Sequence, residues 1–125
     1  MDTSINPIYI VGGSKGGVGK SIVALALVDH LKRRNANIVL VETDTSNPDV
    51  MKAVHDEIEC AAFDLDEADG WIGLVNFCDT HRDAVVIIKM AARNQAGAAR
   101  CNATLIPLTG PRPLEALLAY ALKLA

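Results

Sequence analysis

The sequence has few aromatic residues and no excess of positive charge, and each shortage argues against a class of protein. Aromatic residues make up 4% of the 125-residue chain, which leaves little surface on which nucleic-acid bases could stack. The formal net charge is −3, so no overall positive field draws the chain to DNA or to an anionic membrane. No run approaches the roughly 20 apolar residues of a membrane-spanning helix. A chain of 125 residues has the usual length of one domain, so we expect a single domain over residues 1–125.

Cysteine is also scarce. Cys60, Cys78 and Cys101 form no C-x-x-C pair, and their odd number argues against a disulfide scaffold. We expect small buried thiols in a reduced, cytoplasmic protein, and an iron–sulfur or zinc site is the alternative. The N-terminus lacks the basic segment of a secretory signal.

A glycine-rich loop between a predicted strand and a predicted helix is the main positive feature. Residues 11–21 read VGGSKGGVGKS, after an apolar strand over 8–11 and before a helix over 20–34. The glycines let the backbone curl around phosphate oxygens, and the helix adds the positive end of its dipole. Lys20 can reach the phosphates, and the Ser21 hydroxyl can bind Mg²⁺. The alternative is a glycine-rich turn that binds nothing.

The loop departs from the general phosphate-binding motif at Ser14, where a glycine would stand, but residues 15–21 read KGGVGKS. This segment resembles the deviant Walker A loop of the ParA/MinD-like P-loop ATPases, with Lys15 as its signature lysine. The resemblance implies ATP and Mg²⁺ as ligands and an ATP-dependent homodimer, in which Lys15 reaches the partner's nucleotide. The residues that would bind the nucleotide are Gly16, Gly17, Val18, Gly19, Lys20 and Ser21.

The same resemblance implies a fold. We expect an α/β, P-loop NTPase-like three-layer sandwich with a mainly parallel sheet. The resemblance covers about residues 7–97 and leaves 98–125 unmatched. Domains of this family are usually much longer, so the sequence predicts a sheet that is incomplete relative to the family.

An acidic segment, residues 42–49 (ETDTSNPD), follows a second apolar strand over 38–41. Carboxylates at this end of a parallel strand lie where α/β sheets bind ligands. The family carries D-x-D-P here; by that match Asp44 lies near Mg²⁺ and the attacking water, and Glu42 takes the first acidic position. The alternative is a polar turn that caps a helix at Asp49. The candidate catalytic residues are Lys15, Lys20 and Asp44, and the candidate metal ligands are Ser21, Glu42 and Asp44.

A third apolar strand, over residues 84–88, ends where the family carries the Walker B aspartate. Lys89 stands there instead. A lysine cannot ligate Mg²⁺, so either the acidic segment suffices, or hydrolysis is impaired, or the match is displaced. Asn94 and Gln95 follow as candidates for a water-orienting switch, or as ordinary loop residues.

Five further elements are predicted from apolar periodicity. The helix over 20–34, described above and not one of these five, is apolar nearly all round, so we expect it to be well buried. Two glycines, at 70 and 73, should weaken the helix that contains them. The five elements are a helix over 49–54, a strand over 58–63, a helix over 67–81, a strand over 104–107 and a helix over 114–125.

Four functions are compatible with these patterns. The first is an ATPase that positions plasmids, chromosomes or transfer machinery, with a partner protein and non-specific DNA as further partners. The second is a nucleotide-binding module with little or no hydrolysis, which Lys89 favours. The third is a small-molecule kinase or amidoligase, which needs a substrate pocket. The fourth is a partial domain without activity of its own.

A carboxylate introduced at position 89 tests whether Lys89 stands at the Walker B position. We expect Lys89→Asp to raise ATP turnover, because a carboxylate there would help to hold Mg²⁺ against the phosphates. Phosphate release from the folded variant and from the wild type measures the effect. Equal rates would count against placing Lys89 at the Walker B position.

Overall fold

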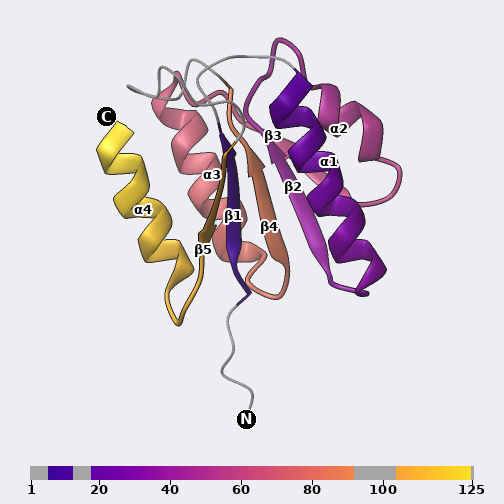
Figure 1. The fold of residues 1–125 in the computed structure, drawn as a ribbon. Helices are drawn as coiled ribbons and strands as arrows, with labels where there is room; N and C mark the ends of the chain where they lie inside the picture. Colours follow the sequence, from indigo (N-terminus) through magenta and orange to yellow (C-terminus); the bar gives the residue numbers. More distant parts are fainter. Residues whose placement is uncertain (1–5, 13–17, 92–103, 125) are drawn as a thin grey trace.

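The computed structural model describes residues 6–12, 18–91 and 104–124, which form an α/β fold with five strands and four helices (Figure 1). The predicted elements are confirmed, with ends that shift by no more than two residues. The strands are β1 (Ile8–Gly12), β2 (Ile38–Glu42), β3 (Glu59–Ala62), β4 (Val85–Lys89) and β5 (Thr104–Leu108). The helices are α1 (Val18–Arg33), α2 (Asp49–Val54), α3 (Ala68–Thr80) and α4 (Pro113–Leu124).

The five strands form one mixed sheet in the order β3-β2-β4-β1-β5. The first four are parallel to one another, and β5 pairs antiparallel with β1. The mainly parallel sheet was predicted, whereas the antiparallel edge was not. Strand β4 lies between β1 and β2, and Lys89 is in register with Val11 on one side and with Glu42 on the other. Lys89 therefore occupies the middle of the carboxyl edge of the sheet.

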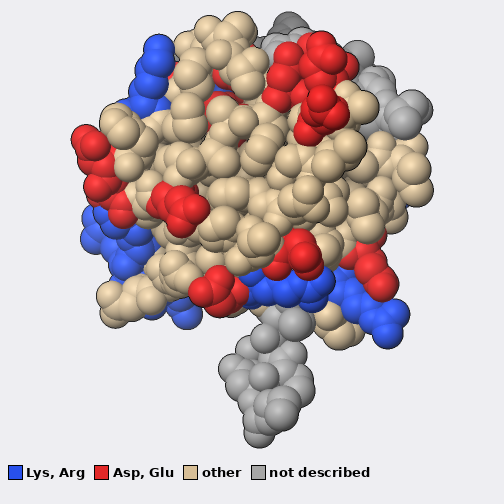
Figure 2. Space-filling view, turned by 180° about the vertical axis from the view of Figure 1, so that it is seen from behind, with Lys and Arg blue, Asp and Glu red and all other residues tan. Residues whose placement is uncertain are grey.

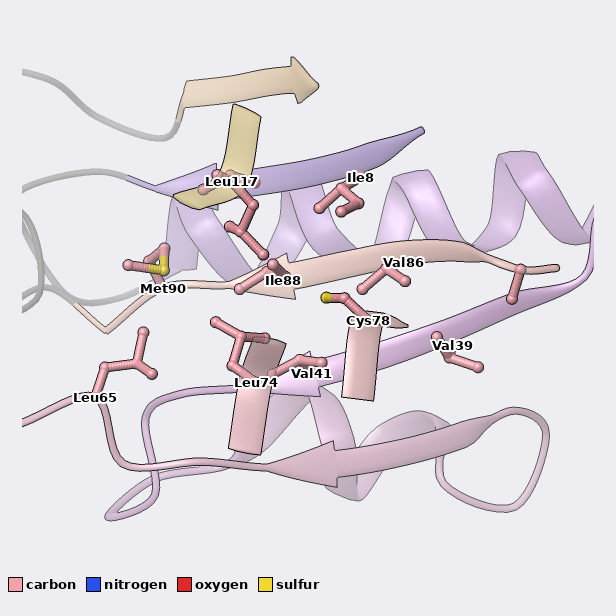
Figure 3. Packing of buried hydrophobic residues seen from close by; sticks show 12 residues of the cluster. Ile8, Val39, Val41, Leu65, Leu74, Cys78, Val86, Ile88, Met90 and Leu117 are labelled. Atoms are coloured by element: carbon pink, nitrogen blue, oxygen red, sulfur yellow. The ribbon is translucent and has the colours of Figure 1, made fainter. Parts of the chain in front are cut away.

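Helices cover both faces of the sheet and create two hydrophobic clusters (Figure 1). Side chains alternate along each strand, so Val86 and Ile88 of β4 face α3 and α4, while Val85 and Ile87 face α1 and α2. Figure 3 shows the cluster on the α3 side. Each such side chain, once buried, stabilises the fold by about 1.5–3 kcal/mol.

Helix α1 is not buried on all sides, so that expectation was wrong. Ala24 and Val28 pack against the sheet, but Ile22 is 57% exposed. A helix that lies on one face of a sheet buries only the stripe that faces the strands. None of the helices in the described ranges has the length and apolar character that a membrane crossing requires.

The described part of residues 98–125, which matched no family motif, contributes to the core. Strand β5 extends the sheet beyond β1, and α4 inserts Leu117 into the cluster on the α3 side. Leu117 is 1% exposed. Strand β5 thus covers the edge of β1, and α4 covers part of the sheet face on the α3 side.

The cysteines in the described ranges are free thiols. Cys78 is buried and Cys60 is half-buried, and burial raises the pKa of Cys78 to about 12. Cys101 lies outside the described residues. The described residues also contain no group of three or more His, Cys, Asp or Glu side chains that could hold a metal ion.

Gly70 allows the first turn of α3 to approach the preceding loop closely. A Cβ atom at this position would lie 1.8 Å from the carbonyl oxygen of Asp64. At Gly73 the nearest atom would be 2.6 Å away, in the ring of Phe63. A ring can turn aside more easily than backbone can, so Gly70 is the stricter requirement.

We therefore expect Gly70→Ala to lower the free energy of unfolding by about 1–3 kcal/mol, because the backbone must move. Gly73→Ala should cost less, and urea denaturation compares both variants with the wild type. Helix propensity alone predicts a gain of about 1 kcal/mol for either change. A stabilised Gly70→Ala protein would therefore contradict the close approach.

Candidate functional site

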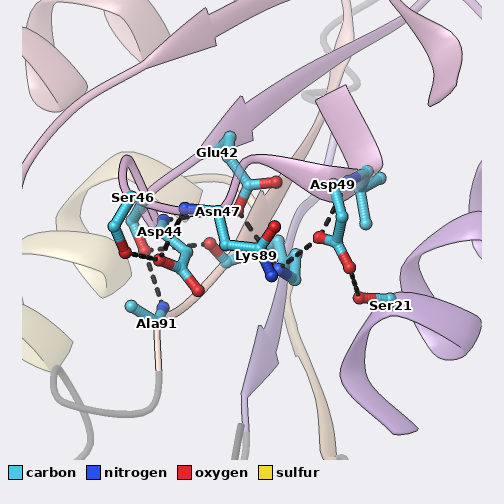
Figure 4. Close-up of polar contacts among 10 residues, drawn as sticks. Ser21, Glu42, Asp44, Ser46, Asn47, Asp49, Lys89 and Ala91 are labelled. Atoms are coloured by element: carbon cyan, nitrogen blue, oxygen red, sulfur yellow. Dashed lines mark hydrogen bonds and ion pairs between the residues drawn. The ribbon is translucent and has the colours of Figure 1, made fainter. Parts of the chain in front are cut away.

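A cluster of charged side chains lies at the carboxyl edge of the parallel strands (Figure 4). Glu42 is the last residue of β2 and Lys89 the last of β4, while Asp49 begins α2. Lys20 and Ser21 come from the N-terminal part of α1. In open α/β sheets ligands bind at this edge, where loops from adjacent strands diverge.

Alternation along the strands explains why these side chains meet. Leu40 and Ile87 belong to the cluster that packs against α1 and α2. Glu42 and Lys89 each stand two positions further along, so they project to the same face. The register then sets Glu42 directly opposite Lys89.

Lys89 is a buried cation held by two carboxylates. Its Nζ lies 2.9 Å from Oδ1 of Asp49 and 3.4 Å from Oε2 of Glu42, and its side chain is 4% exposed. Burial alone would lower the pKa of Lys89. The hydrogen bond to Asp49 and the charges of both carboxylates outweigh that effect and raise this pKa. Lys89 therefore remains an ammonium ion at neutral pH.

Asp49 connects Lys89 to the helix that follows the loop. Its second oxygen, Oδ2, accepts a hydrogen bond of 2.5 Å from the Ser21 hydroxyl. Burial alone would raise the pKa of Asp49, but the hydrogen bonds from Ser21 and Lys89 lower it. Sequence reasoning treated Asp49 only as a helix cap, and its link to Lys89 was missed.

Glu42 is the most deeply buried carboxylate of the cluster. It is 0% exposed, and its Oε1 atom has no hydrogen-bond partner in the described structure. Its Oε2 accepts a hydrogen bond of 3.3 Å from the backbone N–H of Asp44. Burial raises the pKa of Glu42, and the opposing charge of Lys89 only partly offsets this effect.

Thr43 fixes the backbone at the ends of the two central strands. Its hydroxyl donates to the carbonyl oxygen of Lys89 at 2.9 Å and accepts from the N–H of Ala91 at 2.8 Å. Its own N–H also donates to the Lys89 carbonyl, at 3.1 Å. Thr43 is fully buried, so these bonds are shielded from water and hold β2 and β4 in register.

Asp44 takes part in the turn after β2. Its Oδ1 accepts hydrogen bonds from the Ser46 hydroxyl at 2.9 Å and from the Asn47 N–H at 3.3 Å. This is the polar turn considered as the alternative to a catalytic role. Asp44 is nevertheless close enough for its charge to act on Lys20.

Lys20 is a second buried cation beside the cluster. It is 4% exposed. Burial and the charge of Lys89 lower the pKa of Lys20, against the opposite effects of Asp44, Glu42 and Asp49. Two ammonium groups therefore converge on this edge of the sheet.

The remaining predicted site residues are divided between α1 and the segments outside the described residues. Val18 and Gly19 lie in the first turn of α1. Those outside the described residues are Lys15, Gly16, Gly17, Asn94 and Gln95.

The side-chain oxygens of Ser21, Glu42 and Asp49 are not arranged to bind the Mg²⁺ ion that the loop motif implies. Mg²⁺ takes oxygen ligands in a near-ideal octahedron. Here Glu42 and Asp49 are both paired with the Lys89 ammonium, and the Ser21 hydroxyl donates to Asp49. A divalent cation at these oxygens would lie beside a buried positive charge, which repels it.

Comparison with known proteins identifies one informative relative. Protein MobD of Acidithiobacillus ferrooxidans is 55% identical over 98 residues, which are 78% of this chain and 43% of MobD. The matched segment therefore spans less than half the length of that protein. No family model matches the chain, and no solved structure matches it either.

The burial of Glu42 predicts a pH dependence of stability. Because the pKa of Glu42 is raised in the folded state, its contribution to stability is lost as pH rises through that pKa. Glu42→Gln carries no such charge. We expect its free energy of unfolding, relative to the wild type, to increase as pH rises from about 4 to 7.

Urea unfolding at several pH values measures this difference. The matched control is Glu115→Gln, at an exposed carboxylate on α4, whose surface ion pair contributes little. A Glu42→Gln difference that stays constant or shrinks with pH would show that burial does not dominate at Glu42.

Proposed function

We propose that this protein binds ATP at the carboxyl edge of the sheet and that its fold is of the P-loop NTPase type. The observation that carries the proposal is the position of the glycine-rich sequence. It runs from the end of β1 into α1, and Lys20 and Ser21 follow in the N-terminal part of that helix. Strand, loop and helix in this order form the context that the motif needs.

The described residues support an anion site at this edge. The N-terminal end of α1 presents backbone N–H groups and the positive end of the helix dipole. Lys20 and Lys89 add two buried ammonium groups. The choice of ATP over other nucleotides rests on the resemblance of residues 15–21 to the ParA/MinD-like loop.

Binding with little turnover is the form of this function that the site favours. Phosphoryl transfer to water depends on positioned charges at the phosphates and on an oriented water. Glu42 and Asp49 are occupied by Lys89, and Asp44 takes part in a turn. Hydrolysis is the second candidate, because Asp44 lies at the expected strand end and its charge acts on Lys20.

The wider role follows from the resemblance at Lys15. It is the ATP-dependent positioning of a plasmid, a chromosome or transfer machinery by a cytoplasmic homodimer with a partner protein. Non-specific DNA is a further partner on the same basis. In the view of Figure 2, Lys and Arg are interspersed with Asp and Glu rather than gathered in one basic area. This face therefore adds no support for DNA binding, which we propose from the resemblance.

ATP titration combined with size analysis tests this function. We expect Lys20→Ala to weaken ATP binding by about 10- to 100-fold, because a charged hydrogen bond contributes about 1.5–3 kcal/mol. Lys15→Ala should still bind ATP but form no ATP-induced dimer. Lys52→Ala, at an exposed lysine on α2, is the control. Wild-type protein that binds no ATP would refute the proposal, and a dimer indifferent to ATP would refute the family mechanism.

A further inference from the structure

The charges at the carboxyl edge balance to within one unit without an added ion. Lys20 and Lys89 contribute two positive charges, and Glu42, Asp44 and Asp49 contribute three negative charges. Lys89 is in direct contact with the carboxylates of Glu42 and Asp49. Two of the acidic groups that could attract a divalent cation, Glu42 and Asp49, are therefore already paired with Lys89.

The Lys89 ammonium lies among the oxygens that a divalent cation would need. One oxygen of Asp49 faces Lys89 Nζ at 2.9 Å, and the other accepts the Ser21 hydroxyl at 2.5 Å. Glu42 Oε2 lies 3.4 Å from the same Nζ. The ammonium thus shares the Asp49 carboxylate with the serine that the loop motif assigns to Mg²⁺.

We propose that the Lys89 ammonium takes the place of Mg²⁺, so that this protein binds nucleotide phosphates without a divalent cation. The inference rests on the proposed function and adds the ion requirement of the site. Lys89 is fixed at the end of a central strand, where the Thr43 bonds hold its backbone. The positive charge is therefore in place before any ligand arrives.

Charge and hydrogen-bonding capacity both agree with this role. The family carries an aspartate where this chain has Lys89. A lysine in place of an aspartate makes the local charge more positive by two, which equals the charge of one Mg²⁺ ion. An ammonium group has three N–H donors, and among the described residues Lys89 uses two carboxylates as acceptors. One donor can therefore face a phosphate oxygen.

The unpartnered Oε1 atom of Glu42 is an acceptor, so a hydrogen-bond donor such as water completes it, and not a phosphate oxygen. Its Oε1 is buried and accepts no hydrogen bond in the described structure. A purely structural ion pair of this depth would be expected to satisfy both oxygens, because an unmade buried hydrogen bond costs about 1–3 kcal/mol. The cluster is therefore incomplete as a structural pair.

ATP titration in MgCl₂ and in EDTA tests the inference. For the wild type we expect affinities in the two conditions to agree within about twofold. For Lys89→Asp we expect ATP binding to be about tenfold or more weaker in EDTA than in MgCl₂, because the charge must then come from the ion. Lys52→Asp, with the same change of charge at an exposed site, should behave like the wild type.

The neutral variant Lys89→Gln gives a second measurement if the aspartate disturbs folding, which circular dichroism would reveal. We expect it to bind ATP about tenfold or more weakly than the wild type in EDTA. Wild-type binding that requires MgCl₂, or a Lys89→Gln protein that binds normally in EDTA, would overturn the inference but leave ATP binding intact. Absence of binding in both conditions would instead refute the proposed function and the inference with it.

Discussion

The burial of one positive charge constrains the whole carboxyl edge of the sheet. An ammonium group away from water is tolerated only when it is paired and hydrogen-bonded. Lys89 meets this requirement through Glu42 and Asp49. Removal of either partner would leave Lys89 with one carboxylate instead of two, so the ends of β2 and β4 and the start of α2 depend on one another.

This cluster also ties the loop's helix to the sheet. Asp49 contacts Lys89 with one oxygen and Ser21 with the other, so α1, α2 and β4 meet at a single carboxylate. Thr43 locks β2 to β4 from the buried side. The N-terminal part of α1 is thereby held in a fixed position relative to the strand ends, as a phosphate site requires.

The same arrangement accounts for both aspects of the proposed function. Two buried ammonium groups, from Lys20 and Lys89, suit an anionic ligand. The carboxylates that would otherwise attract a metal ion are committed to Lys89. The proposed function is therefore the holding of phosphates rather than their hydrolysis, with the tethered ammonium of Lys89 in the place proposed for Mg²⁺.

The sequence by itself determined the order of the elements and the motif, because apolar runs such as residues 38–41 and the KGGVGKS loop act locally. It also marked Lys89 as anomalous. It predicted the strand that became β5 but not its antiparallel direction, and it did not predict the contact between Lys89 and Asp49, which lie 40 residues apart. Only the tertiary structure decided that contact, because it depends on β4 lying beside β2 and on α2 packing against the same face of the sheet, and neither follows from local pattern.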